Sequence, residues 1–301
     1  MIEITFLGTV SGIPSKERNH PAIALEYYSK KKETLLFDCG EGTQKQLMIA
    51  GISFMKIHKV FITHWHADHF AGLIPLLQTM SLEKRKNELK IFAPEAEKFV
   101  ANILSLGYFG CRFSVIPINV PFHGDKITLV DETEDYQVFS VPTFHSVPSV
   151  AYAFKEKDRW SVDPEKIKKF KLGRGRWLEK LKKYGRAEYK GREVKIEEVA
   201  NLKKGLKVVY SGDTRPCDTI VKVSEGADLL IHDGTFLEEE SSKAHADVKQ
   251  AARIAKKAGV KQLILTHISR RYTDVKELEE SAKKIFENTK VAYDFMKVVL
   301  K

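Results

Sequence analysis

Apolar and polar positions follow two patterns along most of the chain, one typical of strands and the other of helices. Short apolar runs predict strands, and segments with apolar residues every three or four positions predict helices. The expected strands are residues 2–8, 22–28, 34–40, 59–64, 89–94, 138–145, 207–213, 227–236 and 261–267, and the expected helices are residues 41–50, 71–85, 95–106, 247–259 and 274–289. Strands that alternate with helices in this way predict an α/β sandwich.

Residues 155–204 break this alternation. The segment contains KLGRGRWLEKLKKYGRAEYKGRE and has no apolar face suited to the main core, so we expect an insertion in a single domain that spans residues 1–301. It carries 18 Lys and Arg against 9 Asp and Glu, whereas the whole chain has a net charge of +10. A basic excess gathered in one segment is typical of proteins that bind polyphosphates. The alternative is a solvated helical hairpin with incidental charge.

Composition narrows the class of protein. Hydrophobic residues make up 43% of the chain, as in soluble globular proteins, and no apolar run reaches the roughly 18 residues that a membrane-spanning helix needs. The opening MIEITFLGTV does not have the layout of a secretory signal. Cys39, Cys111 and Cys217 are far apart and odd in number, which argues against a disulfide framework. We therefore expect a cytoplasmic protein with no membrane partner and with these cysteines as small core residues.

The motif THWHADH, residues 63–69, holds three of the ten histidines and an aspartate directly after a predicted buried strand. His64 and His66 are two residues apart, so on an extended segment they share one face. Asp68 and His69 follow at once. Imidazole nitrogens and carboxylate oxygens fixed by a rigid backbone are what a zinc site requires. The alternative is a polar turn that carries surface histidines.

Further residues able to bind a metal follow other predicted strands. His145, Asp213 and His267 each come just after an apolar run, at the strand ends where α/β sheets commonly place active sites. Taken singly, each could cap a turn. Taken with the histidine-rich motif, they predict a site that holds two metal ions.

The set HWHADH, His145, SGDTRP and LTHIS resembles the metallo-β-lactamase superfamily, and within it the ribonuclease Z family. The similarity covers nearly the whole chain, because LLFDCGEGTQKQL, LLIHDGTF and the P-x-K-x-R-N loop at residues 14–19 also fit that family. The resemblance implies an α/β fold, a four-layer αββα sandwich with a protruding basic arm. Residues 155–204 match the position of the arm that grips the tRNA elbow in those enzymes.

The resemblance also implies a role for each candidate residue of the site. It implies two Zn²⁺ per subunit, one bound by His64, His66 and His145, the other by Asp68, His69 and His267, with Asp213 bridging them. Asp68 is then the base or orienting group for the attacking water, and His245 the acid or oxyanion stabiliser. Asp233 would orient the ring of His245, and Asp38 would support the ligand loop.

Substrate contacts are expected from two segments. In the loop of residues 14–19 they are Lys16, Arg18 and Asn19, near the cleavage site, and in the arm they are Gly173, Arg174, Gly175, Arg176 and Lys180. Of the other histidines, His20, His58 and His123 are expected in loops or at the surface, and His232 could contact the site.

The activity implied by this resemblance is the removal of the 3′ trailer from precursor tRNA. The cut follows the discriminator nucleotide and leaves a 3′-hydroxyl on the tRNA and a 5′-phosphate on the trailer. The family usually acts as a homodimer. One alternative is a zinc hydrolase of the same fold that acts on a small ester, lactone or phosphodiester, but such a substrate needs no basic arm. Another is a non-catalytic RNA-binding protein, which would be free to lose Asp68 or His267.

Overall fold

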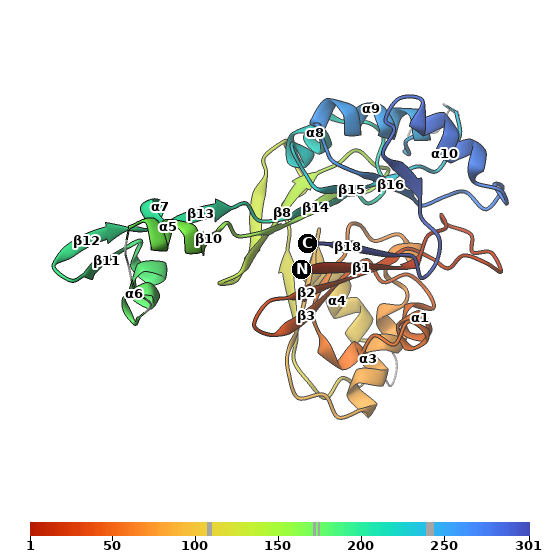
Figure 1. Ribbon diagram of the computed structural model, residues 1–301. Coiled ribbons are helices and arrows are strands. Elements are labelled where there is room, and N and C mark those ends of the chain that lie inside the picture. Colours follow the sequence, from red (N-terminus) through yellow and green to blue (C-terminus); the bar gives the residue numbers. More distant parts are fainter. Residues whose placement is uncertain (107–109, 171–172, 174, 239–243) are drawn as a thin grey trace. The chain divides into compact units, whose positions relative to one another are not determined.

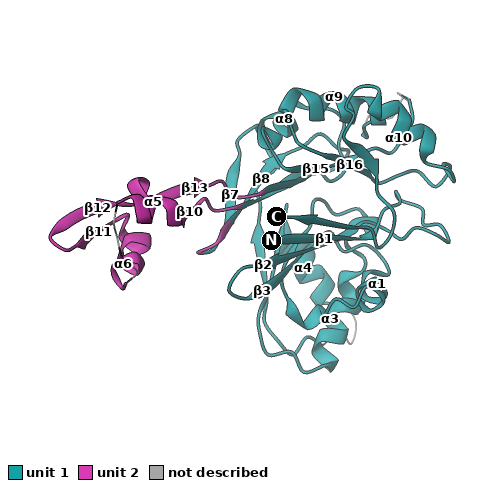
Figure 2. Cartoon of the chain, in the orientation of Figure 1, with its two compact units in different colours: residues 1–133, 137–155, 207–301 teal, residues 134–136, 156–206 magenta. Residues whose placement is uncertain are grey.

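The computed structural model describes residues 1–106, 110–170, 173, 175–238 and 244–301. The chain divides into two compact units, shown in different colours in Figure 2. The first consists of residues 1–133, 137–155 and 207–301, and the second of residues 134–136 and 156–206. No helix in the described parts of the chain is both long and apolar enough to cross a membrane.

The first sheet of the larger unit has seven strands in the order β18-β1-β2-β3-β4-β5-β6. Their bounds are β1 Ile2–Gly8, β2 Ala22–Tyr28, β3 Lys32–Phe37, β4 Ile57–Phe61, β5 Leu89–Ala93, β6 Val115–Asn119 and β18 Lys297–Leu300. Strands β3 to β6 pair in parallel, and parallel neighbours need a crossover connection. The crossovers contain α1 Thr43–Ile49, the 3₁₀ turn Phe54–Lys56, α2 Ala67–Phe70, α3 Leu73–Leu82 and α4 Ala96–Leu104.

The second sheet also has seven strands, in the order β17-β16-β15-β14-β9-β8-β7. Their bounds are β7 Thr128–Glu132, β8 Tyr136–Pro142, β9 Val150–Glu156, β14 Lys207–Tyr210, β15 Leu229–Asp233, β16 Leu263–Thr266 and β17 Thr289–Val291. Strands β14 to β17 are parallel and are connected through α8 Asp218–Ser224, α9 Val248–Ala258 and α10 Lys276–Lys283.

The two sheets pack face to face with helices on both outer faces. Figure 1 shows α1, α3 and α4 on one side of the sandwich and α8, α9 and α10 on the other. Aromatic rings fill the space between the sheets: Phe61 of the first sheet lies 5.3 Å from Tyr152 of the second, measured between ring centroids. The central strands are buried on both faces, which explains their nearly continuous apolar sequences. The expected αββα sandwich is confirmed.

The smaller unit has its own elements and its own core. Its bounds are β10 Arg159–Val162, α5 Pro164–Lys169, α6 Trp177–Tyr184, β11 Arg186–Tyr189, β12 Arg192–Lys195, α7 Ile196–Val199 and β13 Ala200–Lys203. β10 pairs with β13, and β11 forms a hairpin with β12. Trp177, Leu181 and Val194 are among the buried residues of a core cluster confined to this unit. The smaller unit therefore has a hydrophobic core of its own, made of apolar side chains that the sequence pattern alone did not reveal.

Candidate metal centre

The seven predicted ligands come together at the ends of strands from both sheets. His64, His66, Asp68 and His69 lie between β4 and α3, where the chain leaves the first sheet. The other three follow strands of the second sheet: His145 after β8, Asp213 after β14 and His267 directly after β16. β8 ends at Pro142 and β14 at Tyr210, so two of these ligands stand in loops beyond the strands rather than at their last residues.

Three histidines form the first cluster. Nδ1 of His66 lies 3.0 Å from Nε2 of His64 and 3.1 Å from Nε2 of His145. Nitrogens bound 2.0–2.1 Å from one tetrahedral zinc lie about 3.3 Å apart, close to this spacing. Burial lowers the pKa of all three rings, and lowers that of His64 well below its ordinary value. The neutral imidazole favoured by burial is the form that binds a metal.

The ring of His145 is oriented by a backbone contact. Its Nδ1 lies 3.0 Å from the carbonyl oxygen of Ala244. Because a carbonyl oxygen only accepts, Nδ1 carries the proton and Nε2 presents its lone pair to the cluster.

Two aspartates and two histidines form the second cluster, Asp68, His69, Asp213 and His267. Nε2 of His69 lies 3.3 Å from Oδ1 of Asp213 and 3.4 Å from Oδ2 of Asp68. Nε2 of His267 lies 3.1 Å from Oδ2 of Asp213 and 3.5 Å from Oδ2 of Asp68. Oδ2 of Asp213 is also 3.9 Å from Nε2 of His64, so Asp213 lies beside both clusters.

Unpartnered atoms indicate that this second cluster is built for a cation. Nε2 of His69 and Oδ1 of Asp213 are both buried, and neither has a hydrogen-bond partner within the described residues. Leaving such groups unsatisfied is costly, and a cation between them would satisfy both. Burial lowers the pKa of His69, but the charges of Asp213 and Asp38 outweigh burial and raise it well above its ordinary value. The cluster thus attracts positive charge, and its nitrogen and carboxylate donors suit zinc.

Asp38 holds the loop of residues 63–69 in place through hydrogen bonds. Its fully buried carboxylate accepts hydrogen bonds from Thr63 N–H, His69 Nδ1 and Tyr210 O–H, each at 2.7 Å. The hydroxyl of Thr63 contacts the same carboxylate and lies 3.0 Å from Nδ1 of His64. Asp38 therefore fixes the ring of His69 directly and that of His64 through Thr63. The sequence reasoning did not single out Thr63 and Tyr210 for this role.

Thr235 has the corresponding role beside the second sheet, and it was also missed. Its hydroxyl lies 2.6 Å from Oδ1 of Asp233 and 2.9 Å from Nδ1 of His267.

Asp38 and His267 both have backbone φ angles near +60°, at +56° and +60°. This conformation is uncommon for residues other than glycine and occurs where surrounding contacts over-determine it, often in active sites.

His245 and Asp233 form a pair at the edge of the second cluster. Nδ1 of His245 donates to Oδ2 of Asp233 at 2.9 Å, and the ring stacks on that of His267 with centroids 5.2 Å apart. Burial lowers the pKa of His245, but the hydrogen bond to Asp233 and the charges of Asp233 and Asp213 outweigh it and raise the pKa to about 9. Two residues later, Asp247 caps α9 by accepting from Gln250 N–H, which fixes this part of the backbone. The arrangement holds a protonated imidazole beside the ligands.

A cleft of about 310 Å³ opens onto these groups. It is lined by Ser11, Gly12, His66, Asp68, Asp213, Thr235, Phe236, His245, His267, Ser269 and Arg271. Phe236 and Arg271 were not singled out from the sequence, although Phe236 ends the quoted segment LLIHDGTF and Arg271 follows LTHIS closely.

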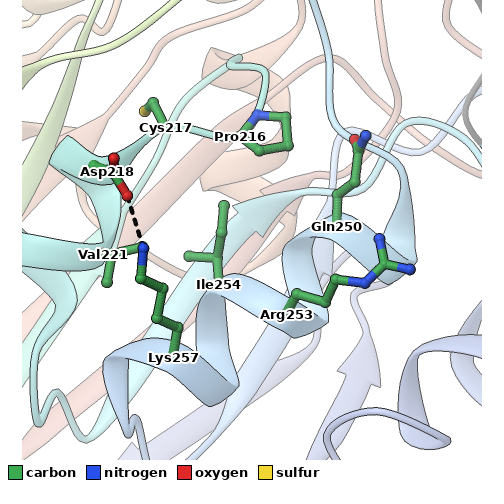
Figure 3. Close-up of a pocket in the computed structure, with 8 residues that line it drawn as sticks. All are labelled: Pro216, Cys217, Asp218, Val221, Gln250, Arg253, Ile254 and Lys257. Atoms are coloured by element: carbon green, nitrogen blue, oxygen red, sulfur yellow. Dashed lines mark hydrogen bonds and ion pairs between the residues drawn. The ribbon is translucent and has the colours of Figure 1, made fainter.

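A second hollow, of about 370 Å³, lies between α8 and α9 and contains none of the metal-cluster residues (Figure 3). Its wall includes an ion pair in which Lys257 Nζ lies 2.8 Å from Oδ1 of Asp218. Lys257 and Asp218 neutralise each other, and the hollow has no metal-cluster residue. We therefore assign the candidate catalytic site to the first cleft.

The loop of residues 14–19 is tied to the rest of its unit by two of its three candidate substrate residues. Nη1 of Arg18 donates to Thr9 Oγ1 and to the Ala292 carbonyl, each at 2.7 Å. Asn19 Nδ2 donates to the Glu41 carbonyl at 2.7 Å. Lys16 is exposed. The structure thus gives Arg18 and Asn19 bracing contacts within the protein and leaves Lys16 exposed, and substrate contacts by these three residues remain a proposal.

The candidate residues of the arm are placed as follows. Gly173 N–H donates to the Tyr189 hydroxyl at 2.8 Å, and its carbonyl accepts from Trp177 Nε1 at 2.9 Å. The side chains of Arg176 and Lys180 are exposed, as is Gly175. Arg174 lies outside the described residues.

The remaining histidines lie outside both metal clusters. His58 and His123 are exposed, and His20 lies in the loop between β1 and β2, as expected, although the residue is only 6% exposed. The chain buries it because its backbone packs against Gly8, where a side chain would collide with the His20 carbonyl oxygen. His232 is fully buried, with Nδ1 donating to the Asp233 carbonyl at 2.8 Å, and belongs to neither metal cluster.

Comparisons with known proteins agree with this geometry. The Beta-lactamase superfamily domain matches residues 196–268, and the family described as Anti-Pycsar protein Apyc1 matches residues 2–108. The chain is 43% identical over 307 residues to the ribonuclease Z of Methanothermobacter thermautotrophicus, covering 100% of this chain and 97% of that protein. It is 42% identical to the ribonuclease Z of Pyrococcus abyssi, with the same coverage. Among solved structures, the short form of human tRNase Z matches with a TM-score of 0.71 and 27% identity, covering 99% of each chain.

Proposed function

The chain belongs to the ribonuclease Z family, and from this premise we propose that it is a zinc-dependent endonuclease that removes the 3′ trailer from precursor tRNA. The observation that carries the proposal is a pair of donor clusters beside one cleft, in a chain related to that family over its full length. The cleft is lined by His66 of the first cluster and by Asp68, Asp213 and His267 of the second.

We propose two zinc ions. His64, His66 and His145 would hold one, and Asp68, His69 and His267 the other, with Asp213 shared because it lies beside both clusters. Zinc held there would activate a water molecule for attack on phosphorus and offset the charge of the phosphate. His245 is assigned to proton transfer, since its Nδ1 is engaged by Asp233.

The side chains then divide the work of hydrolysis. We assign to Asp68 the orientation of the attacking water and the acceptance of its proton, since its carboxylate lies within the second cluster and its lowered pKa keeps it ionised. Burial alone would raise that pKa, but the nearby rings of His267 and His69 outweigh burial. The oxygen of the water bonds to phosphorus, and the bond from phosphorus to O3′ of the discriminator nucleotide breaks. His245 donates a proton to that oxygen, which leaves a 3′-hydroxyl on the tRNA and a 5′-phosphate on the trailer.

The basic segment and the loop of Lys16 are proposed to bind the substrate. The excess of Lys and Arg in residues 155–204 suits the phosphates of a folded RNA, with Arg176 and Lys180 exposed on the smaller unit. We further propose a homodimer that acts in the cytoplasm.

Incubation with a 3′-extended tRNA tests the proposal. The zinc-loaded protein should release the intact trailer with a 5′-phosphate, and a chelator should abolish the reaction until zinc is restored. If the protein hydrolyses small esters, lactones or phosphodiesters in a zinc-dependent way but leaves tRNA uncut, the site belongs to a small-molecule hydrolase instead.

A further inference from the structure

Phe236 and Arg271 form a stacked pair inside the metal-binding cleft. The guanidinium carbon of Arg271 lies 5.3 Å from the centroid of the Phe236 ring, and both side chains line the cleft with Asp68, His245 and His267. The Phe236 ring also meets the ring of His245 nearly edge-on, at 6.3 Å between centroids. An aromatic ring covered by a planar cation therefore stands next to the proposed proton donor.

The backbone around this pair is held by contacts from three directions. Ser269 N–H donates to the Thr235 carbonyl at 3.2 Å, and Leu237 N–H donates to the Tyr272 hydroxyl at 3.1 Å. Phe236 itself forms a β-bridge with Asp247, in which its carbonyl accepts from Val248 N–H at 2.9 Å. The pair is thus positioned before any ligand arrives, which reduces the entropy lost on binding.

We propose that Phe236 and Arg271 form a stacking platform for the nucleobase of the discriminator nucleotide. Single-stranded bases are recognised largely by stacking on aromatic rings and guanidinium planes, whatever the base. The cleft, at about 310 Å³, is in the range of pockets that enclose one small ligand, from roughly 300 Å³ upward. Ser11 and Ser269 on its wall offer hydroxyl groups to the ribose or phosphate.

The choice of the discriminator rests on the proposed function. Cleavage that leaves a tRNA 3′-hydroxyl makes O3′ of the discriminator the leaving oxygen, so the proposed proton donor must face that nucleotide. Because Phe236 is a neighbour of His245, the platform lies on the same side of the scissile phosphate as the leaving oxygen. The first trailer nucleotide lies on the other side of the phosphorus atom.

A double-mutant cycle between protein and substrate tests the platform. The measurement is single-turnover kcat/KM for a 3′-extended tRNA with a normal or an abasic discriminator, with wild-type protein and with Phe236→Ala or Arg271→Ala. On the normal substrate each variant should lose about 10- to 100-fold, as expected from the removal of base stacking. On the abasic substrate the same variants should be less than about twofold slower than the wild-type protein, because the base that stacks on the platform is already absent. Phe236→Trp should restore most of the rate.

Controls separate the platform from the activity itself. Zinc content by elemental analysis should be the same in Phe236→Ala and the wild-type protein, which would show an intact metal centre. Phe144→Ala is a matched control: it removes another arginine-stacked ring, 5.0 Å from Arg215, that does not line the cleft, and it should not couple to the abasic substitution. The proposal is overturned if Phe236→Ala reduces kcat/KM by the same factor on the normal and the abasic substrate. It is also overturned if the variant couples only to an abasic first trailer nucleotide. If the wild-type protein hydrolyses the small phosphodiester but cuts no tRNA, it is the proposed function that fails.

Discussion

At the scale of single residues, two histidines of the centre are oriented by different kinds of acceptor. His145 Nδ1 donates to a neutral carbonyl, and burial lowers its pKa. His245 Nδ1 donates to the carboxylate of Asp233, which raises its pKa to about 9 despite burial. The first arrangement favours a neutral imidazole that can bind a metal. The second favours a protonated imidazole that can donate a proton.

The first prediction follows from this contrast. His245→Ala should retain its zinc and its affinity for tRNA but lose cleavage by about 10²- to 10⁴-fold, the usual contribution of a general acid or oxyanion donor. His267→Ala should lose zinc together with activity. Zinc content by elemental analysis and single-turnover cleavage of a 3′-extended tRNA provide the measurements. A zinc-depleted His245→Ala protein would move His245 into the ligand set, and a fully active one would remove its catalytic role.

The second prediction concerns pH. Asp233→Asn removes the carboxylate that raises the pKa of His245, so that pKa should fall from about 9 toward or below its ordinary value. A proton donor works only below its own pKa. The alkaline limb of the pH–rate profile should therefore move to lower pH in the variant, while the acidic limb stays in place. An unchanged alkaline limb would show that another group controls it.

The third prediction concerns support of the ligands. Asp38→Asn, which tolerates the left-handed backbone at this position, replaces one acceptor oxygen with a donor and disturbs the contacts to Thr63 and His69. Zinc affinity should fall by about 10- to 100-fold, as is usual when a partner of the ligands is lost. Competition with a chromogenic chelator measures it. The matched variant Tyr210→Phe removes one hydrogen bond to the same carboxylate and should have a smaller effect. Equal affinities in all three proteins would contradict this role for Asp38.

At the scale of elements, strong apolar runs predicted most of the central strands, but β9 was missed although its sequence VAYAFKE is apolar and almost wholly buried. The expected strand at residues 2–8 coincides with β1, and the expected helix at residues 247–259 contains α9. β6 and β7 were also missed: β6, VIPIN, is apolar but contains Pro117, a residue that argues against a strand, and β7, TLVDE, is half-buried with no clean alternation. β17 was missed because a strand of three residues carries too little pattern, whereas β18, KVVL, was missed although its apolar run is as long as that of β14.

The candidate ligands could be picked out from the sequence because side chains able to bind a metal stand out beside apolar strands. Their support could not, since Thr63, Tyr210 and Thr235 are ordinary strand and loop residues until the fold brings them against Asp38 and Asp233. The same reason hid the core of the smaller unit. Trp177 and Leu181 are one turn apart on α6 within a charged sequence, and Val194 of β12 meets them only after the hairpin and the helix have formed.

The fourth prediction tests the smaller unit as an element. Arg159 and Lys203 are paired across β10 and β13, so a short Gly-Ser turn can replace residues 160–202 without separating the two ends. This variant should cleave precursor tRNA poorly but hydrolyse bis(p-nitrophenyl) phosphate normally. In the intact protein, Arg176→Ala and Lys180→Ala should each reduce the slope of log affinity against log salt by about one if each side chain contacts one phosphate. Equal loss on both substrates would mean that the segment stabilises the fold.

At the scale of the larger unit, the metal centre joins its two halves. Four ligands follow β4 of the first sheet, whereas His145, Asp213 and His267 follow strands of the second. Asp213 contacts residues of both groups, with its oxygens 3.3 Å from His69 Nε2 and 3.1 Å from His267 Nε2. Zinc bound there would link the two sheets at the edge where their strands end.

This division of the ligands has a consequence for folding kinetics. Neither half of the sequence can assemble the site alone, so the site exists only after the two sheets have packed, late on the folding pathway. Interactions absent from the transition state change the unfolding rate and leave the folding rate unaltered. Zinc should therefore slow unfolding in denaturant steeply while barely affecting refolding, which stopped-flow fluorescence with and without the metal can measure. Faster refolding with zinc would mean that the ligands meet early, and that the ion acts as a nucleus for the sandwich.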